Sequence, residues 1–283
     1  MSPRLIDDLP RPSGARGIRV WLKASGYARR LLLGDGGDPW VSAASYLAFF
    51  NQAQGLLRPD VGVVDVGELY RSWIGRHPAL AAEMAAKKRA AFPLRRMLED
   101  AAPRRLLAEV VEAVAASLRG QTPLVLAMPA PRHWLAEAAA LAGRDGVEIE
   151  PDAIEDAAMY MADLMRAVST LPIGGLLLEE APGAIPVPDA DMEGYRPLVN
   201  VARHYRWGLA LRARPGRAAA EFDSVISADP PRGGDLALGL DVGGDFWSGA
   251  PLADLDAGQF YFAEIPVGAE PEAVLKHLAR LRA

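Results

Sequence analysis

The stretch LALGLDVGGDFW (236–247) begins as a continuous apolar run and ends in an aspartate followed by two glycines. An apolar run without alternation is typical of a parallel strand that is covered on both faces. Asp241 then places a carboxyl group at the carboxyl end of that strand. The same order occurs in VVDVG (63–67), where Asp65 closes a valine-rich run before a glycine. The two stretches predict strands of one parallel sheet, each ending in a carboxylate and a glycine that gives the backbone freedom.

Eight apolar runs alternate with helical patterns along the chain. We expect strands at 17–22, 61–66, 123–128, 174–180, 207–213, 223–228, 236–242 and 260–265, and helices at 40–55, 78–119, 131–143, 152–170, 191–205 and 270–282. This alternation favours an α/β fold, a (β/α)8 TIM barrel, over an open doubly wound sheet. Little room remains for a helix within 214–235, so we expect short or irregular crossovers there.

The domain organisation follows from length and from the absence of a linker. A chain of 283 residues fits one barrel of roughly 250 residues, and the sequence shows no internal repeat. We therefore expect a single barrel domain over 17–283 with a short N-terminal arm over 1–16.

Composition excludes several classes of protein. The 31 Lys and Arg residues and 36 Asp and Glu residues give a net charge of −5 and form no basic stripe, which argues against nucleic acid as a partner. The chain has no cysteine, which excludes disulfides, thiolate nucleophiles and zinc sites built on sulfur. No signal-peptide pattern and no membrane-length apolar run is seen. We expect a cytoplasmic protein that acts on a small molecule.

The residues that follow the apolar runs are mostly charged. In chain order they are Lys23; Asp65 and Glu68; Arg132, His133 and Trp134; Glu179 and Glu180; Arg212 and Arg214; Asp229; Asp241 and Asp245; and Glu264. In a TIM barrel these strand ends form the active-site face. Polar groups there must be paired or solvated, which predicts a charged mouth. It could be a set of oxygen ligands for a metal, a set of general acids and bases, or a collar of salt bridges.

Each of these residues also has a purely structural interpretation. An Asp or Glu after a strand often caps the next helix or pairs with an arginine. His133 is the one histidine at a predicted strand end, where it can serve as an acid or base or as a hydrogen-bonded core residue. The sequence contains no nucleophile elbow, Walker loop or dinucleotide-binding glycine pattern.

Four stretches carry a family resemblance, and it rests on their order along the chain. They are TPLVLAMPAPRHWL (122–135), IGGLLLEEAPG (173–183), LALGLDVGG (236–244) and FYFAEIPVGAEPEAVLKHLARLR (260–282). The chain resembles a distant member of the uroporphyrinogen decarboxylase superfamily, which includes cobamide-dependent methyltransferases and the catalytic barrel of cobalamin-independent methionine synthase. The resemblance implies a TIM barrel with a pocket at its carboxyl-terminal face, and DVGVVDVGELY (60–70) maps the decarboxylase's catalytic aspartate onto Asp65.

The sequence also departs from that superfamily. An arginine-rich N-terminal signature is not visible, and Glu264 stands near the place of the histidine expected after the eighth strand. The methyltransferases hold zinc with cysteine thiolates, which this chain lacks.

The first functional hypothesis is a decarboxylase or C–C lyase that acts without a metal or other cofactor on a small carboxylated or aromatic metabolite. Asp65, His133 and Asp241 are its candidate catalytic residues. Arg132 or Arg212 would anchor a carboxylate, His133 or Asp65 would transfer the proton, and Asp241 would orient the substrate or stabilise a cation. The candidate substrate-binding residues are Lys23, Arg132, Trp134, Glu180, Arg212, Asp229, Gly243, Asp245, Trp247 and Glu264.

Two alternatives stay open. One is a methyl or one-carbon transferase with a metal held by oxygen and nitrogen atoms of His133, Glu180, Asp241 and Glu264. The other is a non-catalytic barrel that binds a ligand or serves a partner enzyme. The resemblance also suggests a homodimer, because decarboxylases of this family are often dimers.

Overall fold

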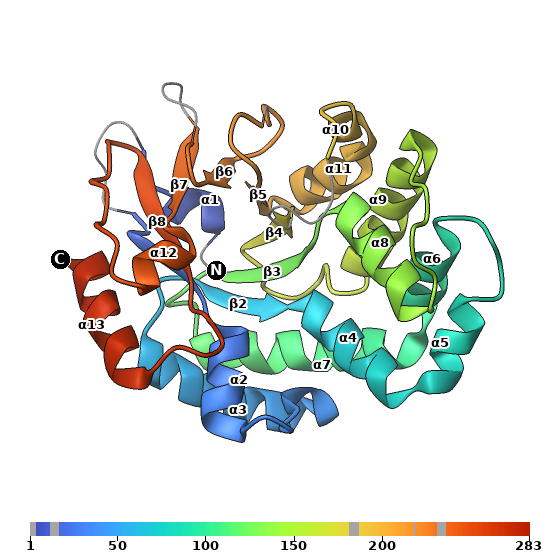
Figure 1. Cartoon of the computed structure of the whole chain (residues 1–283), viewed down its shortest axis with the longest axis horizontal. Helices are drawn as coiled ribbons and strands as arrows, with labels where there is room; N and C mark the ends of the chain where they lie inside the picture. The colour runs from blue at the N-terminus through green and yellow to red at the C-terminus, as the bar shows by residue number, and fades with distance from the viewer. Residues whose placement is uncertain (1–3, 12–16, 181–186, 218, 231–235) are drawn as a thin grey trace.

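Eight parallel strands form a nearly closed barrel in the computed structural model, which describes residues 4–11, 17–180, 187–217, 219–230 and 236–283 (Figure 1). The strands are β1 (Val20–Lys23), β2 (Gly62–Asp65), β3 (Leu124–Pro129), β4 (Gly175–Glu179), β5 (Gly208–Arg212), β6 (Ser224–Ser227), β7 (Ala237–Asp241) and β8 (Gln259–Glu264). Each coincides with one of the predicted apolar runs. The predicted TIM barrel is therefore confirmed.

The strands pair in the order β1-β8-β7-β6-β5-β4-β3-β2, and every pair is parallel. The two ends of this order, β1 and β2, are not hydrogen-bonded to each other, so the barrel stays open along one seam. The pairing aligns strand ends that are far apart in sequence, such as Lys23 with Glu264 and Glu179 with Arg212.

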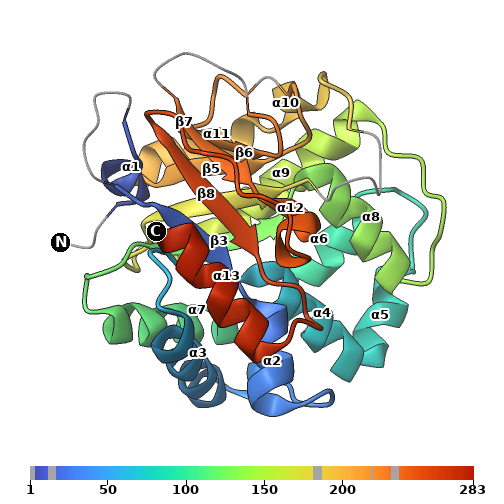
Figure 2. The same cartoon turned by 60° about the vertical axis from the view of Figure 1, so that its left-hand side comes forward.

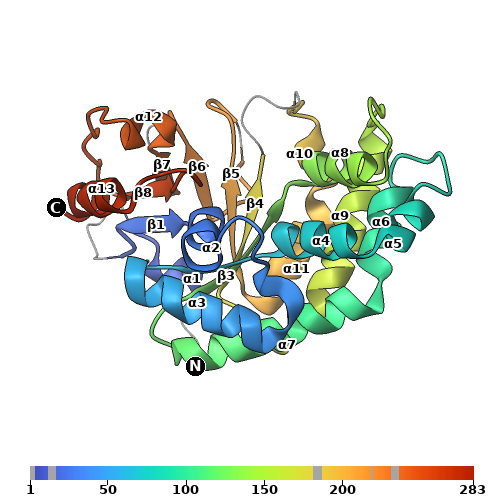
Figure 3. The ribbon, with the colours of Figure 1, turned by 60° about the horizontal axis from the view of Figure 1, so that its bottom comes forward.

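Helices cover the outside of the barrel (Figures 1 and 3). They are α2 (Ser25–Leu33), α3 (Ala43–Leu57), α4 (Val66–Arg76), α5 (Pro78–Met84), α6 (Phe92–Glu99), α7 (Ala101–Leu118), α8 (Pro131–Leu141), α9 (Pro151–Arg166), α10 (Asp191–Gly194), α11 (Arg196–Tyr205), α12 (Gly243–Trp247) and α13 (Pro271–Arg282), with a 3-10 helix at Pro39–Val41. Figure 3 shows α3 and α7 side by side beneath the strands, where they contact each other. No helix of the described residues has the length and apolar character needed to cross a membrane.

The helix prediction differs from the structure in several places. The expected continuous helix at 78–119 is three helices, because Pro93 lies in the first turn of α6 and Asp100 caps α7 by accepting the N–H of Ala102 at 3.0 Å. Helices α2 and α4 were not predicted, since each begins within two residues of the end of a strand. No described residue of the β5–β6 crossover is helical, as expected, whereas residues 231–235 of the β6–β7 crossover lie outside the described residues.

The barrel interior is filled by apolar side chains from alternate positions of the strands. Trp21 lies at its centre, with ring centroids 6.1 Å from Phe260 and 6.2 Å from Phe262. Within the predicted arm, residues 4–11 are described and the rest of 1–16 lies outside the described residues. There α1 (Leu5–Asp8) inserts the fully buried Leu5 into this core, and its N–H donates to the carbonyl of Gly174 at 3.1 Å. These contacts fill the amino-terminal end of the barrel.

A separate apolar layer lies outside the barrel, where β8 packs with α12 and α13 (Figure 2). The two glycines after Asp241 begin the five-residue helix α12 (Gly243–Trp247), which the sequence did not predict. Gly243 adopts a φ of 64°, a conformation that favours glycine, and its N–H donates to Asp241 Oδ1 at 3.1 Å.

Candidate functional site

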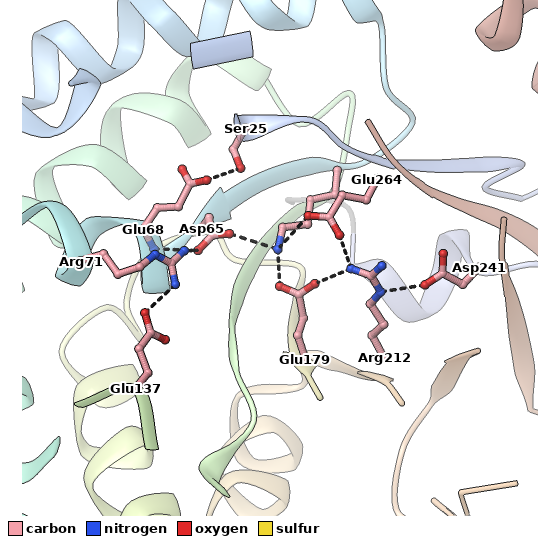
Figure 4. Close-up of polar contacts among 10 residues, drawn as sticks. Ser25, Asp65, Glu68, Arg71, Glu137, Glu179, Arg212, Asp241 and Glu264 are labelled. Atoms are coloured by element: carbon pink, nitrogen blue, oxygen red, sulfur yellow. Dashed lines mark hydrogen bonds and ion pairs between the residues drawn. The ribbon is translucent and has the colours of Figure 1, made fainter. Parts of the chain in front are cut away.

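Six strand ends turn a charged side chain into the mouth of the barrel. Side chains of a strand alternate between its two faces, so a residue two positions after an inward-facing core residue also faces the lumen. Five strands show this relation with a residue of the apolar interior: Trp21 precedes Lys23, Val63 precedes Asp65, Leu177 precedes Glu179, Ala210 precedes Arg212 and Phe262 precedes Glu264. On β7, Gly239 takes the inward position before Asp241, since a Cβ there would meet Ile226 and Phe260 of the interior. Figure 4 shows Asp65, Glu179, Arg212, Asp241 and Glu264 in one network of polar contacts.

Two cations hold the centre of this network, and they share two carboxylates. Lys23 Nζ lies 2.5 Å from Glu179 Oε2 and 3.9 Å from Glu264 Oε1. Arg212 Nη1 lies 3.3 Å from Glu179 Oε1 and also pairs with Glu264 Oε2. Arg212 Nε pairs with Asp241 Oδ2 at 2.8 Å. Lys23 and Arg212 are thus bridged by Glu179 on the buried side and by Glu264, 44% exposed, on the open side.

The floor beneath Arg212 is aromatic. Its guanidinium carbon lies 4.7 Å from the centre of the Phe262 ring, close enough for a cation–π contact. Burial alone would lower the pKa of Arg212, but the charges of Asp241, Glu264 and Glu179 outweigh it and raise that pKa. Burial likewise opposes a raised pKa at Lys23, and the surrounding carboxylates overcome it. Both side chains therefore stay positively charged at neutral pH.

A second part of the network begins at Asp65, which uses its two oxygens differently. Oδ1 accepts the main-chain N–H of Glu68 at 2.8 Å and so caps α4, while Oδ2 lies 3.2 Å from Lys23 Nζ. Arg71 lies 3.7 Å from Asp65 and binds Glu137 at 2.8 Å. One carboxylate thus fixes the start of a helix and carries a lumen charge at once.

Glu68 is the acid–base candidate of the site. Its carboxyl group accepts a hydrogen bond from the Ser25 hydroxyl at 2.8 Å. Burial, and next the negative charge of Asp65, raise the pKa of Glu68 to about 7, although Ser25, Lys23 and Arg71 oppose the shift. A carboxyl group with this pKa exchanges its proton at neutral pH, which is the property of a general acid or base.

Glu180 faces the other way, although it adjoins Glu179. It is buried, with 4% exposure, behind the barrel wall, where Arg217 Nη2 lies 3.1 Å from its Oε1 and Tyr195 donates a hydrogen bond at 3.5 Å. Strand alternation explains the separation, since consecutive residues point to opposite faces.

The residues predicted after the third strand lie on α8. Arg132 forms a two-pronged ion pair with Asp191, at 2.6 Å and 3.0 Å. His133 is buried in the first turn of α8, with 6% of its surface exposed. The Trp134 ring packs in the core, edge-on to Tyr70 at 5.9 Å. The network of Figure 4 is built from other residues.

The remaining predicted residues lie outside the charged network. Asp229, Gly243 and Asp245 are exposed. Trp247 packs against His277 of α13, with ring centroids 5.7 Å apart, and so belongs to the apolar layer outside the barrel.

The structure thus brings together seven of the predicted strand-end charges and adds two residues that were not predicted, Ser25 and Arg71. The seven are Lys23, Asp65, Glu68, Glu179, Arg212, Asp241 and Glu264. Glu68 and Glu179 were predicted as strand-end charges but were not among the candidate catalytic or substrate-binding residues, although the sequence held a signal for each. Glu179 stands two positions after the inward-facing Leu177, and Glu68 stands three positions after Asp65, the spacing of a capping box. Ser25 and Arg71 had no such signal, because only the packing of α2 and α4 brings them to the site.

Among the described residues, no group of three or more His, Asp or Glu side chains is arranged to hold a metal ion. The arrangement is instead one of paired charges with a titrating carboxyl group beside them. This chemistry suits the binding of a charged substrate and the transfer of a proton.

Comparison with models of known protein families finds no match to this chain, and no curated protein matches it.

Proposed function

We propose that this protein is an enzyme that removes carbon dioxide from a small carboxylated metabolite, as a distant member of the uroporphyrinogen decarboxylase superfamily. The observation that carries the proposal is the shared bridging of Lys23 and Arg212 by two carboxylates, next to a carboxyl group whose pKa is about 7. The barrel and the position of Asp65 at the carboxyl end of β2 support the same assignment.

The cation pair supplies an anchor for the substrate. Glu264 is the most exposed member of the bridge, and a rotation of its side chain would break its ion pairs with both Lys23 and Arg212. A substrate carboxylate that takes its place restores the same charge and the same two ion pairs. Glu179 stays on the buried side and keeps the two cations in position.

Glu68 supplies the proton. When the bond to the carboxyl carbon breaks, carbon dioxide leaves and the electron pair passes into an aromatic or carbonyl group of the substrate. The protonated Glu68 then donates its proton to the carbon, and solvent returns a proton to Glu68. Asp65 acts on this step in the ground state, because its charge keeps the proton on Glu68 near neutral pH.

The transferase alternative has less support from the contacts. Of its proposed metal ligands, Asp241 and Glu264 are both engaged by Arg212, and Glu180 pairs with Arg217 outside the lumen.

The anchor can be tested without knowing the substrate. Binding of acetate and benzoate is measured by NMR titration for the wild type, Arg212→Met and Glu264→Ala. Arg212→Met is expected to abolish binding, and Glu264→Ala is expected to strengthen it, because the internal competitor is removed. Glu180→Gln is the matched control, since this neighbouring buried carboxylate faces away from the lumen. Anion binding that is insensitive to Arg212 and Glu264 contradicts the proposal.

The chemical step is tested with a panel of aromatic and 3-oxo acids, by detecting released carbon dioxide. Glu68→Gln is expected to slow the reaction by about 10²- to 10⁴-fold, the usual contribution of a positioned acid. The wild-type rate is expected to fall as the pH rises above about 7, since Glu68 then loses its proton. A pH profile that Glu68→Gln leaves unchanged would remove Glu68 from the mechanism.

A further inference from the structure

The open seam of the barrel contains a cavity. It lies where β1 and β2 fail to pair, and the residues that line it include Lys23, Ser25, Tyr46, Phe49, Phe50 and Ala53. Below it, Asp60 closes the seam by accepting the N–H groups of Arg19 and Val20 at 3.1 Å and 3.0 Å. The cavity is therefore a half-open space between two strand edges, with residues of α2 and α3 in its wall.

The two ends of this cavity differ in chemistry. One end is formed by Lys23 and Ser25, which also belong to the charged network through Glu179 and Glu68. The rest of the wall is mostly apolar, with Phe49 and Phe50 of α3 among the lining residues. The seam thus runs from the proposed carboxylate anchor into an aromatic and aliphatic enclosure.

Tyr46 lines the cavity and is also affected by the charges of the network. Burial, followed by the charges of Glu68 and Asp65, raises its pKa well above the ordinary value. The phenol is therefore neutral, and it lies close enough to Glu68 and Asp65 for their charges to act on it. Each strand edge also presents main-chain groups to the seam, because β1 pairs only with β8 and β2 only with β3.

The size of the cavity limits what can enter it. Its volume is about 50 Å³. At about 10–15 Å³ for each small group, this accommodates roughly three to five non-hydrogen atoms. A short aliphatic chain fits, whereas a fused ring system does not.

We infer that the seam cavity binds the short, mainly aliphatic side chain of the substrate, while its carboxylate lies between Lys23 and Arg212. This inference rests on the proposed function, because it places the carboxylate at the proposed anchor. It assigns the substrate to the class of small 3-oxo acids whose chain continues for about three to five atoms beyond the carboxyl carbon, because the carbonyl group takes the electron pair when carbon dioxide leaves.

The experiment measures the affinity of acetate, propanoate, butanoate, pentanoate, hexanoate and octanoate by NMR titration. Each methylene that enters the cavity is expected to tighten binding about fourfold, as the burial of one methylene group does. The gain is expected to stop near pentanoate or hexanoate, when the cavity is full.

Two variants locate the effect. Ala53→Phe fills the cavity and is expected to abolish the chain-length dependence while acetate still binds. Leu56→Phe introduces the same side chain on the same helix at an exposed position outside the cavity and is the matched control. Phe50→Leu enlarges the cavity and is expected to move the plateau to a longer acid, which gives a second test if Ala53→Phe does not fold.

The outcomes separate this inference from the proposed function. Arg212-dependent binding of all acids with no chain-length dependence overturns the seam assignment and leaves the anchor intact. A chain-length dependence that Arg212→Met leaves unchanged, and that n-alkanols share, shows an occupied seam but contradicts the carboxylate anchor. A dependence that persists in Ala53→Phe places the chain elsewhere and overturns the inference.

Discussion

Lys23 and Arg212, which stand on β1 and β5, are bridged by the same two carboxylates, Glu179 and Glu264. A parallel barrel makes this possible, because all its strands end at the same face. The bridge joins residues that are far apart in sequence, so it forms only when the strands of the barrel are assembled.

Removal of Lys23 is expected to be costly. Lys23→Met leaves Asp65 and Glu179 buried without their main counter-charge, and breaking such a buried pair costs about 3–5 kcal/mol of unfolding free energy. Arg203→Met is the control, because Arg203 and Glu221 form an exposed pair whose loss costs less than about 1 kcal/mol. Urea unfolding measures both, and equal losses would mean that the mouth network does not behave as a buried one.

Glu68 is expected to make stability depend on pH. Its pKa is about 7 in the folded protein against an ordinary value of 4.5, so the folded state binds its proton more tightly than the unfolded state. The stabilisation is full below pH 4.5 and is lost as the pH rises through 7. By linkage, the group contributes about 2–3 kcal/mol more at pH 5 than at pH 8.

Urea unfolding of the wild type and Glu68→Gln at pH 5 and pH 8 checks this expectation. The variant lacks the titrating group, so its unfolding free energy should fall by about 2–3 kcal/mol less than that of the wild type between pH 5 and pH 8. If the two proteins lose the same stability over this range, the pKa of Glu68 is not raised.

The two roles of Asp65 can be separated by two substitutions. Asp65→Asn keeps a side-chain acceptor for the N–H of Glu68 but removes the negative charge, so the pKa of Glu68 is expected to fall from about 7. Asp65→Ala removes the cap as well and is expected to cost about 1 kcal/mol more. NMR titration of the Glu68 carboxyl carbon reads the first effect and urea unfolding the second. Variants of equal stability would show that the cap contributes nothing.

Gly239 is expected to tolerate no side chain. A Cβ at this position would lie 2.6 Å from Ile226 Cγ1 and 2.9 Å from Phe260 Cζ, so the ring that fills the barrel interior would have to move. Gly239→Ala should cost about 1–3 kcal/mol, the usual cost of overpacking. Gly244→Ala is the control in the same stretch, since its Cβ would meet no atom within 4 Å, and its effect should stay within about 0.5 kcal/mol. Thermal and urea unfolding compare the two, and an unperturbed Gly239→Ala would mean that this part of the interior is loosely packed.

Much of the fold was predictable because its signals are local. A continuous apolar run followed by a charged residue identifies a strand and its end without knowledge of its neighbours, and all eight strands were predicted in this way. Helices α2 and α4 escaped prediction because each starts within two residues of a strand end, with no loop to mark the boundary.

The candidate site was predictable in outline only. The charged strand ends were visible, but the choice between Glu179 and Glu180 depends on which face of β4 meets the lumen. The sequence shows two adjacent acids, and only the barrel turns one of them toward Lys23 and the other toward Arg217.

The sequence by itself therefore determined the eight strands, their parallel class and the row of charges at their ends, because these follow from short-range apolar patterning. The tertiary structure alone decided which charges meet, where the barrel stays open between β1 and β2, and that the pKa of Glu68 lies near 7. These properties arise from burial and from charges carried by other strands and helices. They exist only after the strands assemble and bring Lys23, Asp65 and Arg212 to one face of the barrel.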